Sequence, residues 1–288
     1  MVSKLEKTYR WGLLGLALFV AAGAAGAADL ATELAYDDHV RDLVRQGRGE
    51  VAELWGEAGS FGGYAEWVYR SLDAPVDLAA LGAAYREEMS RIPPEALAAI
   101  SHWLSTSLGQ EVTFLMAHLA TPEGQRELQR SGRQIAAMVT ESRQQLLERV
   151  DTATGAGEVA AHEAATWLGL LNAAASQLQE LPDEEDEWRE DLDQVNEGWA
   201  AQYAGRRWTV LAYLYARLSE EELESFLSFA ESGAGQALFA ARKAAALRVV
   251  DLFAGTLQAE QQKLLAQAWA ETAEERRDDE KEDEEEEP

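Results

Sequence analysis

The chain has 288 residues, of which 52 are Asp or Glu and 25 are Lys or Arg, so its formal net charge at pH 7 is −27. Nucleic-acid binding depends on clustered Lys and Arg against phosphates, so this charge excludes a nucleic-acid partner and disfavours anionic membrane surfaces. The sequence contains no cysteine, which excludes disulfides, thiolate metal sites and lipid attachment through an N-terminal Cys.

The N-terminal segment has the pattern of an export signal. Residues 1–10 carry positive charge, residues 11–22 are apolar, and small residues ending at Ala27 offer a cleavage site. We therefore predict that residues 1–27 are a signal peptide, whose removal leaves a periplasmic protein with no stable membrane span. Export without disulfides fits a bacterial periplasm. The alternative is an uncleaved anchor, because the apolar run over 11–28 is close to the minimum length for a span.

After Asp29 the apolar residues recur at helical rather than alternating spacing. Leu78, Leu81 and Tyr85, for example, would share one face of a helix. No segment shows β-branched alternation between hairpin turn signals, so we predict an all-α multi-helix bundle without a sheet. The first helix is expected to start at Asp29 and to stop near Gly47.

Shifts in composition divide the rest of the chain. Small and Gly-rich residues over 151–157 separate a first helical half, 28–154, from a second half, 155–272. A proline and five consecutive acids interrupt the second half at 182–187. Residues 273–288 are mostly acidic, and like charges at this density cannot bury apolar area, so we predict a disordered acidic tail.

The most informative motif lies in the second half. Ser219 followed by Glu222 is a capping-box signature at the start of a Phe-rich helix. The helix then breaks over a segment in which Ser232 is followed by Gly235 and Gln236. The Ser side chain can cap the next helix, and glycine leaves the side of its first turn bare. The preceding helix can then approach closely at a sharp corner.

This corner motif recurs, which predicts two related helical-hairpin halves. The first copy has Glu95, Leu97, Gly109 and Gln110 where the second has the identical residues Glu221, Leu223, Gly235 and Gln236. A third, shorter element contains Thr121, Pro122, Gly124 and Gln125. We predict that these elements are packing corners. The functional alternative is that the helix N-termini hold an anion, because unpaired N–H groups gather there.

The segment 213–257 combines an acidic-Leu helix start at Glu221, a Phe-rich helix, and a small-residue break before Gln236 and a long helix. This combination resembles a secreted bacterial family called domain of unknown function 2059, with a weaker likeness over 85–128. Gly233 departs from the family pattern, which has Pro there. The resemblance implies a helical envelope protein without an established biochemical role, and it carries over no catalytic residue.

A search for catalytic or metal-binding patterns finds none. The histidines are His39, His102, His118 and His162, and none lies in His-Glu-x-x-His. The sequence also lacks a Gly-x-Ser-x-Gly nucleophile elbow and a phosphate-binding Gly-Lys-Ser/Thr loop. We therefore predict a protein that is not an enzyme, with no catalytic, cofactor-binding or metal-binding residues.

Tryptophans supply the candidate contact surface. Trp103 and Trp167 lie within apolar stripes and are predicted to be core. Trp188 and Trp199 lie in polar surroundings beside the acidic interruption, so they are candidates for an exposed interaction surface, where aromatic residues are enriched. The alternative is that these two side chains close the end of the bundle.

Together these patterns favour a non-enzymatic periplasmic interaction module, an adaptor or chaperone-like protein that holds an unidentified protein partner. The net negative charge would attract a basic partner, although it also serves solubility. One alternative is a hydrolase of envelope polymers that uses paired carboxylates. Another is low-affinity cation binding by the acidic tail, which lacks the spaced ligands of an ordered calcium loop.

Overall fold

The computed structural model describes residues 36–57, 69–178 and 187–286, and every regular element in these ranges is a helix. This confirms the predicted all-α multi-helix bundle. The predicted signal peptide and most of the acidic interruption lie outside the described residues. The helices are α2 (Tyr36–Glu57), α4 (Leu78–Met89), α5 (Pro94–Ser105), α6 (Ser107–Ala120), α7 (Pro122–Ala137), α8 (Glu141–Thr154), α9 (Ala156–Leu178), α10 (Glu187–Leu214), α11 (Glu220–Glu231) and α12 (Gly233–Glu286).

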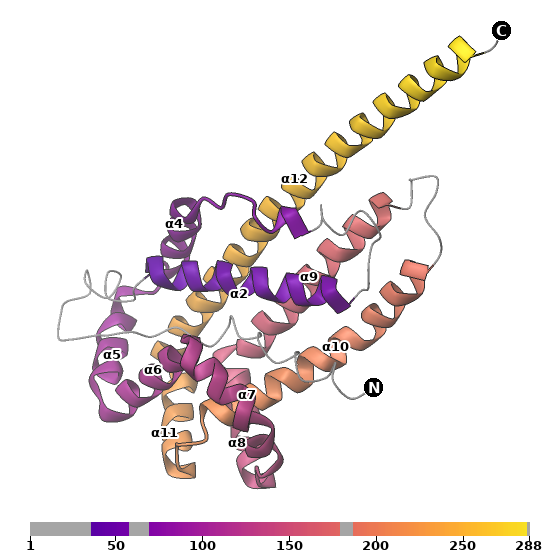
Figure 1. Ribbon diagram of the computed structural model, residues 1–288. Coiled ribbons are helices and arrows are strands. Elements are labelled where there is room, and N and C mark those ends of the chain that lie inside the picture. Colours follow the sequence, from indigo (N-terminus) through magenta and orange to yellow (C-terminus); the bar gives the residue numbers. More distant parts are fainter. Residues whose placement is uncertain (1–35, 58–68, 179–186, 287–288) are drawn as a thin grey trace.

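The long helix α12 organises the bundle (Figure 1). It packs against α4, α5, α8, α9 and α11, and its far end projects beyond the other helices. Around it, α10 lies against α7 and α9, while α11 lies against α8. One apolar core lies between these helices. It contains side chains from both predicted halves, such as Ile100 and Phe226, which are fully buried. The two halves therefore share their interior.

Helix α2 continues through Gly47, so the predicted stop near that residue is wrong. A Cβ atom at Gly47 would lie 2.8 Å from Cε1 of Phe253 and 3.2 Å from Cζ2 of Trp167. Gly47 is therefore a point of close approach between α2 and aromatic side chains of α9 and α12. Helix propensity is a weak determinant, and here tertiary packing overrides it.

The boundary between the predicted halves is a tight turn. Helix α8 ends at Thr154 and is capped by Gly155, which has the left-handed φ of 66°, and α9 begins at the next residue. Glycine adopts this conformation without a Cβ clash. Asp151, in the last turn of α8, accepts a hydrogen bond from Nε of Arg207 on α10 at 3.3 Å. This ion pair ties the turn to the bundle.

Helix α12 has the C-terminal bound Glu286. The disorder predicted for the acidic tail over 273–288 stays a prediction. Glu, Lys, Arg and Ala are good helix formers, and extension of an existing helix avoids the unfavourable nucleation step. Leu265 is the last buried side chain among those described, so α12 projects from the bundle beyond it (Figure 1).

Candidate functional site

Three corners between consecutive helices share one construction. The Ser or Thr hydroxyl donates to the carbonyl oxygen three residues before it, at 2.6–2.7 Å. The hydroxyl oxygen also accepts from the glycine N–H three residues after the Ser or Thr, at 3.0–3.1 Å. The predicted capping by Thr121 and Ser232 is confirmed. The three sets are Thr106 with Trp103 and Gly109, Thr121 with His118 and Gly124, and Ser232 with Phe229 and Gly235.

The glycines of these corners lie directly against the preceding helix, as predicted. An added Cβ would lie 2.1 Å from the Trp103 oxygen at Gly109, 2.1 Å from the His118 oxygen at Gly124, and 2.0 Å from the Phe229 oxygen at Gly235. No side chain fits at these distances. The predicted corner residues therefore have a structural role.

The other corner residues also serve the helix ends. Nε2 of Gln110 donates to the Ser105 oxygen at 3.4 Å, and Nε2 of Gln125 donates to the Leu119 oxygen at 2.7 Å. These bonds satisfy carbonyls that a helix end leaves unpaired. Gln236 instead lines a shallow pocket between α8 and α11.

The predicted capping box is confirmed at the start of α11. The Ser219 N–H donates to Oε2 of Glu222 at 2.8 Å, and the Glu222 N–H donates to the Ser219 hydroxyl at 3.2 Å. The bond from the Ser219 N–H lowers the pKa of Glu222. Ser219 and Glu222 therefore start α11, and they belong to the same structural set as the corners.

The prediction that Trp199 lies on an exposed interaction surface is wrong. Its side chain is 2 % exposed, and its Nε1 donates to the Ala164 oxygen at 3.1 Å. The packing of α10 on α9 buries it, although its neighbours in sequence are polar. Trp188 lies on α10, but its side chain is outside the described residues. Trp103 and Trp167 are buried, as predicted.

A second polar feature lies inside the core. Glu50 on α2 and Glu163 on α9 are both fully buried. Nε1 of Trp167 donates to Oε2 of Glu50 at 3.0 Å, and the Tyr203 hydroxyl donates to Oε2 of Glu163 at 2.9 Å. Hydrogen bonds of this kind offset the cost of burying a polar group. Because a polymer cannot reach these two carboxylates, they do not support the hydrolase alternative.

Buried tyrosines make stability sensitive to alkaline pH. Burial, followed by the nearby Glu50 and Glu163 charges, raises the pKa of Tyr203 well above its usual value. The folded state therefore retains a proton that the unfolded chain loses above about pH 10. The stability associated with Tyr203 is present below that pH and is lost as the pH rises further.

We expect a Tyr203→Phe variant to show a shallower loss of stability at high pH. Above about pH 10 each such tyrosine contributes a slope of about 1.4 kcal/mol per pH unit, which the variant lacks. Urea unfolding between about pH 9 and pH 12 measures both slopes. Equal slopes in the two proteins would show that Tyr203 ionises with the same pKa in the folded and unfolded chains.

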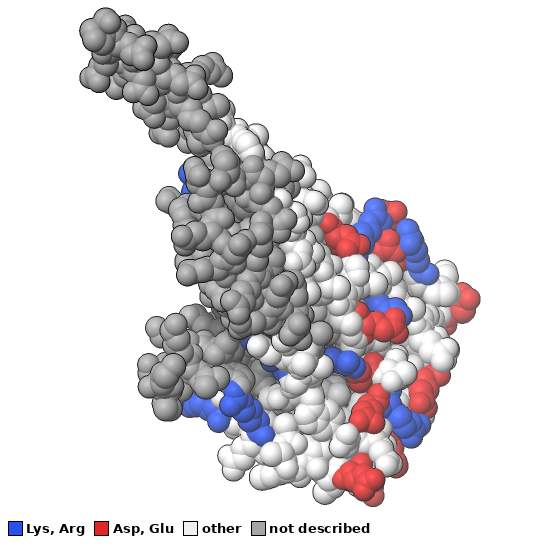
Figure 2. All heavy atoms as spheres, turned by 90° about the vertical axis from the view of Figure 1, so that its right-hand side faces the viewer, with Lys and Arg blue, Asp and Glu red and all other residues white. Residues whose placement is uncertain are grey.

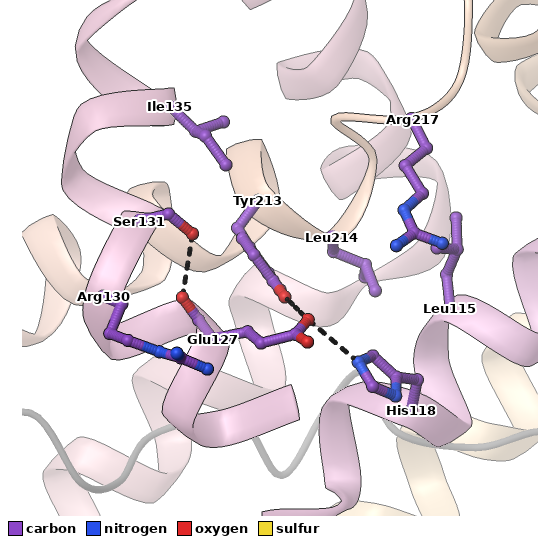
Figure 3. Close-up of a pocket in the computed structure, with 9 residues that line it drawn as sticks. All are labelled: Leu115, His118, Glu127, Arg130, Ser131, Ile135, Tyr213, Leu214 and Arg217. Atoms are coloured by element: carbon purple, nitrogen blue, oxygen red, sulfur yellow. Dashed lines mark hydrogen bonds and ion pairs between the residues drawn. The ribbon is translucent and has the colours of Figure 1, made fainter. Parts of the chain in front are cut away.

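The described surface also contains an open pocket of about 440 Å³ between α6, α7 and the end of α10 (Figure 3). This volume is in the range of small-ligand sites. The inner wall is apolar, since Leu115 and Leu214 are 6 % and 2 % exposed. The lining residues are Leu115, His118, Glu127, Arg130, Ser131, Ile135, Tyr213, Leu214 and Arg217.

A hydrogen-bonded triad crosses the pocket. Oε2 of Glu127 lies 3.2 Å from Nε2 of His118 and accepts from the Tyr213 hydroxyl at 2.9 Å (Figure 3). These bonds, first that to His118, lower the pKa of Glu127. Burial, followed by the bond to Glu127, raises the pKa of Tyr213 to about 12. Glu127 is therefore ionised and Tyr213 protonated at neutral pH, so neither is poised for proton transfer there.

Two further polar side chains of the pocket donate to backbone carbonyl oxygens. The Ser131 hydroxyl donates to the backbone oxygen of Glu127 at 2.8 Å, one helical turn back, and it makes no hydrogen bond to His118 (Figure 3). Nε of Arg130 donates to the Arg126 oxygen at 3.3 Å. Phe114, which is 54 % exposed, stacks on His118 with ring centroids 5.9 Å apart. The pocket therefore combines cations with an apolar wall, and one of its lining residues, His118, stacks on the exposed ring of Phe114.

The sequence did not identify this site. Of the lining residues, only His118 was considered as a functional residue, and it was excluded as a metal ligand. Among the described residues, no group of three or more His, Asp or Glu side chains could hold a metal ion. The spacing of His118 and Glu127 on either side of the Thr121 corner was the available signal. A corner brings residues before and after it face to face.

Comparison of the chain with protein-family models, with curated proteins and with solved structures gives no match. The resemblance to the family called domain of unknown function 2059 therefore stays a prediction. Within the described part of the chain, no helix has both the length and the apolar character needed to cross a membrane.

Proposed function

We propose that this protein is a non-enzymatic interaction module of the bacterial envelope, an adaptor or chaperone-like protein that holds a segment of a partner in the pocket bordered by Arg130 and Arg217. The observation that carries the proposal is the composition of that pocket. It is open, its wall is apolar, and cationic side chains stand at its edge. Such a combination is typical of binding sites.

The chemistry of the pocket favours binding over catalysis. The raised pKa of Tyr213, about 12, means that its hydroxyl is protonated at neutral pH. Two hydrogen bonds stabilise the charge on Glu127. The Ser131 hydroxyl is occupied by a backbone carbonyl. An activated nucleophile needs a base within hydrogen-bond reach and a pKa that lets it lose its proton. Among the described residues of the pocket, the Tyr213 hydroxyl has such a base in Glu127, but its raised pKa keeps it protonated at neutral pH.

Export is part of the same proposal and rests on the sequence pattern of residues 1–27. A periplasmic module would meet its partner in the cell envelope. The resemblance over residues 213–257 supports this assignment, because it implies a secreted helical protein.

Site-specific photocrosslinking tests the proposed function. A photoreactive amino acid at position 114, beside the pocket, is compared with one at position 252 on α12, where the native leucine is also exposed. We expect adducts at 114 and few at 252, with loss of the adducts in an Arg217→Glu background. Sequencing of the same exported protein should begin at or beside Ala28.

Equal adducts at positions 114 and 252 would contradict pocket binding. Recovery of an intact Met1 in the membrane fraction would contradict the exported soluble form. Release of cleaved products from the crosslinked partner would indicate an enzyme instead of a binding module.

A further inference from the structure

The charge of the pocket is opposite to that of the chain. Several basic side chains elsewhere are paired with acids of neighbouring helices: Arg149 lies 3.2 Å from Glu231, and Lys243 lies 2.7 Å from Glu158. On the face shown in Figure 2, basic and acidic side chains are correspondingly interspersed. With 52 acids and 25 bases in the chain, a basic side chain without an acidic neighbour is unexpected.

Arg217 is such a side chain. Among the residues that the structure describes, it forms no hydrogen bond or ion pair. Figure 3 places its guanidinium beside Leu115 and Leu214, while Arg130 extends from the opposite side of the pocket. The only carboxylate of the pocket, Glu127, is already bonded to His118 and Tyr213. The two guanidinium groups therefore have capacity for an anion from outside.

The chemistry of these groups specifies a carboxylate attached to an apolar group. A guanidinium presents its N–H donors in a planar fork that matches a carboxylate in two parallel hydrogen bonds. The wall formed by Leu115, Leu214 and Ile135 lies next to this fork and offers apolar contact to the rest of the ligand. The exposed ring of Phe114 stacks on His118, which lines the same pocket.

The net charge of −27 favours one kind of molecule as the carrier of this carboxylate. A small free anion is repelled by the field of the whole protein, whereas a basic polypeptide is attracted by it and can still present one carboxylate at its end. We propose that the pocket binds the C-terminal carboxylate and the apolar last side chain of a basic polypeptide. This proposal rests on the proposed function, since it specifies what the same pocket holds.

Calorimetry with matched peptides tests this proposal. The first probe is a short peptide with two lysines, alanines and a C-terminal leucine as the free acid, and the second is the same peptide amidated at its C-terminus. The full exported chain should bind the acid about tenfold or more tightly than the amide, as hydrogen bonds to charged groups are worth this factor. Its affinity for the acid should fall as salt screens the lysines.

Two substitutions localise the effect. Arg217→Gln and Arg130→Gln should each weaken binding of the acid by about tenfold and leave the amide unchanged. Arg126→Gln is the matched control. Arg126 is exposed and lies on α7 together with Arg130, but it does not line the pocket. This control should retain the preference for the acid. Circular dichroism of all three variants should show the wild-type helix content, since the three side chains are exposed.

The outcomes separate this inference from the proposed function. Equal binding of acid and amide would overturn the carboxylate inference. So would no binding of either peptide if crosslinks at position 114 persist. Neither result would contradict the proposed interaction module. Binding of N-acetyl-leucine as tight as that of the basic peptide would overturn the polypeptide source. A loss of acid preference in Arg126→Gln equal to that in Arg217→Gln would show a general charge effect and overturn the pocket assignment.

Discussion

Replacement of Gly235 by alanine is expected to destabilise the protein by about 3 kcal/mol, the upper part of the usual range for overpacking. The new Cβ would lie 2.0 Å from the backbone oxygen of Phe229 and 2.8 Å from Cα of Ala230. These atoms belong to the backbone of α11, so a side-chain rotation cannot relieve the clash. At this protein size the melting temperature should fall by roughly 6–12 °C.

Gly233 provides a control two residues away in the same helical turn. A Cβ added there would meet no atom within 4 Å. Gly233→Ala should therefore leave the melting temperature unchanged or raise it slightly, because alanine restricts the unfolded chain. Thermal unfolding followed by circular dichroism measures both variants. Equal effects at the two positions would mean that α11 does not approach the start of α12 as closely as described.

Replacement of Trp199 by alanine is expected to cost about 3–5 kcal/mol, as for other fully buried aromatic side chains. The change leaves a cavity between α9 and α10 and removes the Nε1 donor from the Ala164 oxygen. It also removes the contact with Tyr203, whose ring centroid lies 5.7 Å away. Chemical denaturation gives the free energy of unfolding.

Trp269 is the matched control for this prediction. It is 39 % exposed on the part of α12 that leaves the bundle. Trp269→Ala should change stability by less than about 0.5 kcal/mol, as is usual for surface substitutions. If Trp199→Ala instead left the free energy of unfolding unchanged and no longer bound a partner, the result would support the exposed interaction surface that the sequence predicted.

The corner motifs and the pocket are connected through one residue. The His118 carbonyl accepts from Thr121 and lies against Gly124, so the corner fixes the end of α6 relative to the start of α7. This arrangement sets the imidazole of His118 beside Glu127, one turn into α7. A motif that has a purely structural role therefore positions a side chain of the candidate site.

The sequence by itself determined the local features of this protein. Helical spacing of apolar residues was enough for the all-α class, because that spacing depends only on the geometry of one helix. The capping box at Ser219 and the close approach at Gly235 followed in the same way, since their partners lie within a few residues. These features depend on short stretches of chain.

Only the tertiary structure decided the features that depend on distant residues. Trp199 is buried because α10 packs on α9, and its polar neighbours in sequence carry no information about that contact. Gly47 lies inside a helix at a point that Phe253 and Trp167 approach from elsewhere in the chain, and the sequence around Gly47 does not reveal that approach. The pocket joins Glu127 to Tyr213, 86 residues away. Such pairings depend on how helices pack in space, and no single helix encodes them.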